Sequence, residues 1–135
     1  MMNAARWKLI AWGTFLVAWL VQTIATHLPP RYIDAADMAR LHVSDKSIHY
    51  VVFGVLGFLL AWALWAWLED AWRSGCLALA FGVVWSGIDE WTQQFVYRHS
   101  DWLDFLCDSC GILSGVALFH IVRILVLAWT PRIRA

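Results

Sequence analysis

The sequence predicts an all-α membrane protein, a polytopic bundle of four transmembrane helices that forms a single domain over residues 1–135. Hydrophobic residues make up 61% of the chain and the mean hydropathy is +0.61, whereas soluble domains contain roughly 45–50% apolar residues. The apolar residues also gather in four stretches, each close to the ~20 residues that a helix needs to cross a bilayer. A chain of 135 residues has room for one such domain.

The first two stretches contain no Asp, Glu, Lys or Arg. They run from Leu9 to Pro30 and from Ser47 to Leu68, and they predict helices over residues 7–28 and 47–68. Several of the 11 tryptophans lie near predicted helix ends, where an indole places its apolar body in lipid and its N–H among the head groups. Both stretches are therefore predicted to span the membrane.

The third and fourth stretches carry ionisable residues at one end. The third predicts a helix over residues 74–95, which is apolar through Ile88 and then acquires Asp89, Glu90, Gln93 and Gln94. The fourth predicts a helix over residues 108–130, with Asp108 at its start. Because ionisable groups in or near the hydrocarbon are expensive, they indicate a functional site by default.

The loop charges give an orientation. With a cytoplasmic N-terminus, the inner loops carry Arg6, Lys8, Arg73, Arg132 and Arg134, and the outer loops carry Arg31, Arg40, Lys46 and Arg98. Positive residues favour the cytoplasmic side, so this count of five against four places both termini in the cytoplasm. Whatever the orientation, the polar ends of the second, third and fourth helices are predicted to lie at the same membrane face.

Helical spacing predicts which residues face one another. Residues three or four apart share a helix face, and small residues there let transmembrane helices approach closely. Such stripes are Asp45, His49, Phe53 and Gly57 on the second helix, Gly82, Ser86, Glu90 and Gln93 on the third, and Asp104, Asp108, Gly111 and Gly115 on the fourth. We expect the three helices to direct carboxylates or amides toward a common axis at one depth.

These residues also form an ordered pattern across three helices. The pattern is Asp45-Lys46-x-x-His49-Tyr50, Gly57, Asp89-Glu90-x-x-Gln93, Arg98 and Asp104-x-x-x-Asp108-x-x-Gly111-x-x-x-Gly115. In order and spacing it resembles the VanZ-like family of small integral membrane proteins. The chain departs from the family at Asp108, where many members have Asn, and at Val96-Tyr97, where Pro-Gly is common. The resemblance implies a protein of the cell membrane that acts in the cell envelope. The founding member of the family is associated with low-level resistance to the glycopeptide teicoplanin.

Three interpretations of the polar residues remain open. In the first, the protein binds or modulates an envelope lipid, a glycan precursor or a glycopeptide. In the second, it is an enzyme acting on a lipid-linked phosphate or glycan by acid–base or metal-assisted chemistry. In the third, the polar residues only lock the bundle through ion pairs. The candidate catalytic residues are Asp45, His49, Glu90 and Asp104, and the candidate ligand-binding residues are Lys46, Gln93, Arg98 and Asp108.

The charged residues indicate which ligands and ions such a site could bind. Lys46 and Arg98 could bind the pyrophosphate of a lipid-linked precursor. His49 is expected to share a proton or a ligand with Asp45, Glu90 or Asp104, and the crowded carboxylates could recruit a divalent cation; no other cofactor is indicated. The expected partners are membrane lipids and a lipid-linked precursor or glycopeptide. No segment is typical of nucleic-acid binding.

Overall fold

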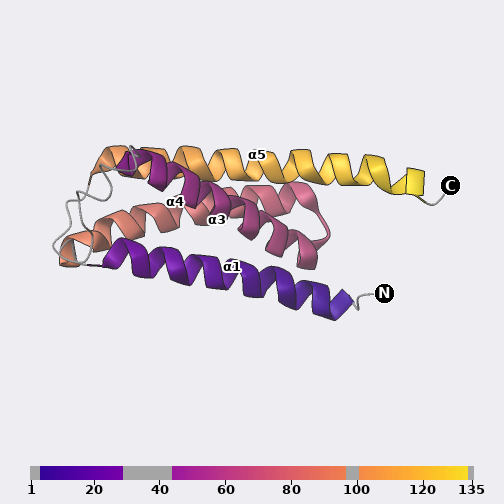
Figure 1. Ribbon diagram of the computed structural model, residues 1–135, viewed down its shortest axis with the longest axis horizontal. Helices are drawn as coiled ribbons and strands as arrows, with labels where there is room; N and C mark the ends of the chain where they lie inside the picture. The colour runs from indigo at the N-terminus through magenta and orange to yellow at the C-terminus, as the bar shows by residue number, and fades with distance from the viewer. Residues whose placement is uncertain (1–3, 29–43, 97–100, 134–135) are drawn as a thin grey trace.

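The computed structural model describes residues 4–28, 44–96 and 101–133, which form four long helices packed side by side (Figure 1). The elements are α1 (Ala4–His27), α3 (Asp45–Leu68), α4 (Ala71–Gln93), the short 3-10 helix η2 (Gln94–Val96) and α5 (Trp102–Ile133). The chain reverses direction between successive helices, so the start of α1 and the end of α5 lie toward one end of the bundle. The last turns of α1 and α4 and the first turns of α3 and α5 lie at the opposite end, which we call the polar end.

Side-chain capping sets where α5 begins. Asp101 precedes the helix, and its Oδ1 accepts a hydrogen bond of 2.9 Å from the backbone N–H of Leu103. This is the interaction by which an aspartate satisfies an orphan donor at a helix N-terminus. The helix therefore begins at Trp102 instead of the predicted Asp108, which places both Asp104 and Asp108 inside the helix. The residues before α3 and α4 cap those helices in the same way.

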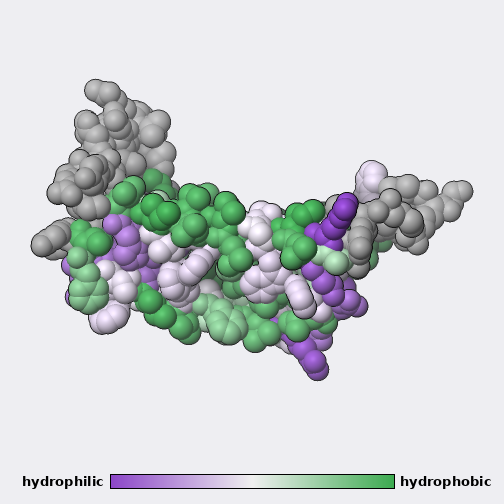
Figure 2. Space-filling view, turned by 90° about the horizontal axis from the view of Figure 1, so that it is seen from below, coloured by the Kyte–Doolittle hydropathy of each residue, from purple (hydrophilic) through white to green (hydrophobic). Residues whose placement is uncertain are grey.

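All four helices are long and apolar enough to cross a membrane, which confirms the predicted class of a four-helix polytopic membrane protein. Figure 2 shows hydrophobic residues along the middle of the bundle and hydrophilic residues gathered at its two ends. Many leucine, isoleucine and valine side chains on the helix flanks are exposed. Lipid tails are as apolar as these side chains, so exposure here costs little free energy.

The tightest contact in the bundle joins α3 and α5 at two glycines. A Cβ atom on Gly111 would collide with the carbonyl oxygen of Tyr50, and one on Gly115 would collide with that of Gly54. The two backbones therefore touch, as the predicted small-residue stripe requires. On α4 the predicted stripe is also turned inward, since Ser86, Glu90 and Gln93 are all buried.

α1 packs less closely against the other helices. Near its N-terminus Ala11 is buried against two alanines of α3, Ala63 and Ala66. Farther along, the rings of Trp19 and Trp85 lie with their centroids 5.0 Å apart. Between these contacts a cavity of about 280 Å³ remains, with aromatic residues of α1 on one wall and residues of α3, α4 and α5 on the others. α1 thus covers the bundle without filling the space beneath it.

Candidate ligand-binding site at the polar end

Buried polar side chains concentrate at the polar end. The residues there with little or no exposed surface are Gln22, His49, Ser86, Asp89, Glu90, Gln93, Asp104 and Asp108. They come from all four helices, and five of them are ionisable. An uncompensated charge in a poorly solvated site is costly, so such groups are normally paired or hydrogen-bonded. The arrangement of the partners therefore defines the site.

A buried pair of ionisable side chains joins α3 to α5. The Nδ1–H of His49 donates a 2.9 Å hydrogen bond to Oδ1 of Asp108, and the two side chains are 5% and 0% exposed. The other carboxylate oxygen of Asp108 is also buried and has no hydrogen-bond partner among the described residues. The sequence predicted a partner for His49 among Asp45, Glu90 and Asp104; the hydrogen bond goes instead to Asp108, one helical turn farther along α5 than Asp104.

Lys46 joins the same two helices one turn closer to the start of α3. Its ammonium group lies 2.8 Å from Oδ2 of Asp101 and 2.9 Å from Oδ1 of Asp104. The hydrogen bond from Lys46, together with the backbone N–H of Leu103, holds the pKa of the Asp101 carboxyl below its ordinary value. Lys46 is thus a bridge between two carboxylates, and its charge is already compensated.

Glu90 and Gln93 connect α4 to the start of α5. Gln93 donates from Nε2 to Asp89 and to Glu90, at 3.2 and 3.4 Å. The other carboxylate oxygen of Glu90 accepts a hydrogen bond from the backbone N–H of Asp101. These contacts fix the end of α4 beside the first turn of α5.

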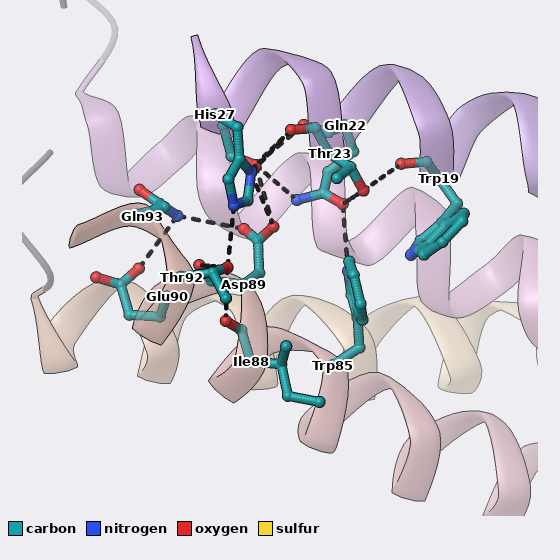
Figure 3. A network of polar contacts seen from close by, with 11 residues as sticks. Trp19, Gln22, Thr23, His27, Trp85, Ile88, Asp89, Glu90, Thr92 and Gln93 are labelled. Carbon is teal, nitrogen blue, oxygen red and sulfur yellow. Dashed lines mark hydrogen bonds and ion pairs between the residues drawn. The ribbon is translucent and has the colours of Figure 1, made fainter. Parts of the chain in front are cut away.

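A second histidine joins the site from α1 (Figure 3). The Nε2 of His27 lies 2.9 Å from Oγ1 of Thr92, and Thr26 donates a 3.1 Å hydrogen bond to Oδ1 of Asp89, which is completely buried. Oδ1 of Asp89 also lies 3.8 Å from Nδ1 of His27. This cluster was not predicted from the sequence. A signal was present, because His27 and Asp89 end the first and third spans and alternate spans end at the same face.

The structure brings most of the predicted site residues to one place. Asp45, His49 and Asp104 each offer an atom that lies within 4.8 Å of the other two. Lys46, Glu90, Gln93 and Asp108 surround them through the contacts given above. Arg98 lies outside the described residues. The roles assigned to these residues stay predictions, whereas their proximity is a property of the fold.

A groove leads along the helices to these residues. It has a volume of about 430 Å³ and runs between α1 and α3. Its apolar wall consists of Ala18, Val21, Ala25, Ile48, Val51, Val52, Phe53, Val55 and Leu56, and its polar lining consists of Gln22, Thr26, Asp45 and His49. The polar residues lie in the turns closest to the polar end, where Ala25 and Ile48 also line the groove, and the lining farther from that end is apolar.

Fold and site together define a small multi-pass membrane protein whose buried ionisable residues meet at one end of a four-helix bundle. The model of the VanZ/LLP1 family matches residues 9–123, which include parts of all four helices and the whole polar end. The chain belongs to the VanZ/LLP1 family. The family match confirms the resemblance seen from residue 45 to residue 115 and extends it over α1. No curated protein and no solved structure matches the chain.

Proposed function

We propose that this protein binds an envelope lipid, with the head group at the polar end and a hydrocarbon chain in the groove between α1 and α3. The observation that carries the proposal is the division of the groove into two parts. Apolar side chains line it along the helices, and Asp45 and His49 line it at the polar end. A molecule that matches both parts has one long apolar chain and a polar head, which is the form of a lipid-linked precursor.

The head group must supply the specificity. A lipid tail gains little by leaving the bilayer for the groove, because tail and groove wall are about equally apolar. The polar residues, in contrast, lie in a poorly solvated place where hydrogen bonds are strong and mismatched partners are costly. The groove therefore positions the lipid, and the residues at the polar end select it.

A purely structural role explains the polar end less well. Hydrogen bonds between transmembrane helices contribute on average about 0.6 kcal/mol, so a large buried set is an inefficient way to gain stability. A network selected for stability alone would also satisfy its buried acceptors, whereas one oxygen of Asp108 has no partner among the described residues. An acceptor of this kind suits a hydroxyl or amide of a ligand.

A second candidate function, catalysis on the bound head group, is favoured by the His49–Asp108 hydrogen bond. A carboxylate that holds one nitrogen of an imidazole orients the other nitrogen for acid–base chemistry or for metal binding. In that case the same lipid would be a substrate. Turnover of a polyprenyl phosphate by the purified protein, lost in a folded Glu90→Gln variant, would favour the enzyme over the binding protein.

The orientation belongs to the same proposal. We place the polar end on the outer face and both termini in the cytoplasm, where envelope precursors on the outer leaflet could reach the site. Sequestering such a precursor would connect the protein to tolerance of teicoplanin-type glycopeptides. Variants with a single native cysteine test the orientation: Cys107 in intact cells should react with a membrane-impermeant maleimide faster than Cys76. The opposite order would reverse the assignment.

Lipid binding is tested with two neighbouring residues of α1. Ala18 lines the groove, whereas Val17 is 64% exposed on the flank of the same helix. Native mass spectrometry of the purified wild-type protein should find a retained lipid. Ala18→Phe should lose it because the ring fills the groove, and Val17→Phe should keep it. Equal retention by both variants, or no lipid enriched over the bulk membrane, would contradict the proposed function.

A further inference from the structure

The polar end holds too much negative charge for a phosphate-bearing ligand. The described residues there include the carboxylates of Asp45, Asp89, Glu90, Asp101, Asp104 and Asp108, against one lysine, Lys46. The sequence of residues 29–43 and 97–100 contributes three arginines and two aspartates, which does not reverse this excess. The ammonium of Lys46 is already bound to two carboxylates. An anionic head group would therefore be repelled unless a cation comes with it.

We infer that Asp45, His49 and Asp104 bind a divalent transition-metal ion. The three residues come from two helices, with Asp45 and His49 one turn apart on α3 and Asp104 facing them from α5. One potential ligand atom from each lies within 4.8 Å of the other two. Ligand atoms 2.0–2.2 Å from a shared ion are roughly 3–4 Å apart, so small side-chain rotations complete the site.

The position of the His49 ring independently indicates a ligand. The side chain is 5% exposed and its Nδ1–H is held by Asp108. Its other ring nitrogen has no hydrogen-bond partner within the described part of the chain, and the residue lines the groove. Metal-binding histidines almost always donate one N–H to a carboxylate or carbonyl, which fixes the ring and aims the other nitrogen at the ion. Asp108 supplies that carboxylate here.

The donor set also indicates which metal fits. One imidazole and two carboxylates suit Mn²⁺ or Zn²⁺, because Ca²⁺ and Mg²⁺ prefer oxygen ligands alone. Three protein ligands leave coordination positions open. A phosphate oxygen of a head group would fill such a position, and the ion would supply the positive charge that the carboxylates require. This last step rests on the proposed lipid binding, whereas the metal site itself does not.

The metal is tested with Mn²⁺ on the full chain in detergent. Mn²⁺ is preferable to Zn²⁺ as a probe because the free thiols of Cys76, Cys107 and Cys110 would capture Zn²⁺. The signal of free Mn²⁺ in electron paramagnetic resonance reports the unbound fraction. The wild-type protein should bind one Mn²⁺ per chain, and Asp45→Asn should weaken binding by at least about tenfold. Asp45 is exposed, so this variant should fold.

Asp101→Asn is the matched control. It removes the same charge at the same end of the bundle, and asparagine can still cap α5. Asp101 lies outside the proposed ligand set, so Mn²⁺ affinity should change by no more than about twofold. An equal loss in Asp45→Asn and Asp101→Asn would show diffuse charge attraction and overturn the inference, as would an absence of saturable binding in the wild-type protein.

Lipid retention separates this inference from the proposed function. If the ion bridges the head group, a chelator should release the retained lipid from the wild-type protein and Mn²⁺ should restore it. Lipid that stays bound after chelation would leave the proposed function standing and overturn the bridging role. Mn²⁺ binding without any retained lipid would support the metal site and contradict the lipid-binding function.

Discussion

The α3–α5 interface and the interface that holds α1 are built in opposite ways. α3 and α5 touch through their backbones at Gly111 and Gly115, with no space for a Cβ atom. α1 instead lies over the bundle with large aromatic side chains, and a cavity and a groove remain beneath it. Gly13 of α1 lies outside this interface: it is exposed, and a Cβ atom there would meet nothing within 4 Å. One interface is filled to the backbone, and the other keeps free volume.

This difference separates two requirements of a binding site. The close contact of α3 and α5 fixes the relative positions of His49, Lys46, Asp104 and Asp108, as a preorganised site needs. The looser packing of α1 leaves a path for an apolar chain and lets the helix adjust to it. We infer that the α3–α5 pair is the rigid half of the site and that α1 is its adaptable cover.

The largest expected effect comes from adding one methyl group at the α3–α5 interface. Gly115→Ala places a Cβ atom against the carbonyl oxygen of Gly54, where the backbone cannot yield easily. We expect the free energy of unfolding to fall by about 2 kcal/mol or more, measured by SDS titration in mixed micelles. Gly13→Ala is the control and should be neutral or stabilise by up to roughly 1 kcal/mol, since alanine favours helix. Similar losses at both sites would refute the close contact of α3 and α5 as the cause.

The next largest loss of stability is expected from breaking the buried His49–Asp108 hydrogen bond between α3 and α5. His49→Ala leaves both oxygens of Asp108 without a partner among the described residues, which should cost about 1–3 kcal/mol. Asp108→Asn keeps an oxygen that accepts from Nδ1–H of His49 and removes the buried charge, so it should cost less than about 1 kcal/mol. The same SDS titration measures both. If Asp108→Asn proves the more damaging change, the carboxylate charge itself stabilises the fold.

A smaller effect is expected where α1 is attached to α4. Thr92→Val removes the hydroxyl that contacts His27 and keeps the side-chain shape. The loss should be about 0.6 kcal/mol, the average for a hydrogen bond between transmembrane helices. Hydrogen exchange should locate it: amides in the last turns of α1 should exchange faster, and those of α3 and α5 should not change. Faster exchange in all helices would mean that α1 unfolds together with the rest.

The same contrast explains what the sequence could predict. Hydropathy gives the four spans, and the alternation of spans places the polar residues at one end without any three-dimensional information. Spacing on a helix also predicts the glycine stripe of α5. Helical spacing alone does not predict the partner of His49, because Asp104 and Asp108 are one turn apart on the same face. The choice depends on the register of α3 against α5, which the contacts of Tyr50 and Gly54 with the two glycines set.

The errors have local causes as well. The first turns of α5 contain Asp104 and therefore look too polar for a membrane helix, although the cap at Asp101 extends the helix to Trp102. The contact of His27 with Thr92 was missed because α1 has no Asp, Glu, Lys or Arg from Leu9 to its end, so the polar pairs Gln22–Thr26 and Thr23–His27 drew no attention. The groove depends on how far α1 stands from α3, and no periodicity of the sequence encodes that distance.

The smallest expected effect on stability tests the free volume beneath α1. Ala18→Phe adds a ring to the groove, where space is already present, so the free energy of unfolding should change by less than about 0.5 kcal/mol. Ala61 is the matched alanine, because it is completely buried in the core of α3. Ala61→Phe should cost about 1–3 kcal/mol through overpacking. Together with the lipid-retention experiment, a stable Ala18→Phe that has lost its lipid would separate the function of the groove from the stability of the fold. A strongly destabilised Ala18→Phe would mean that α1 packs as tightly as α5, and the adaptable cover would have to be abandoned.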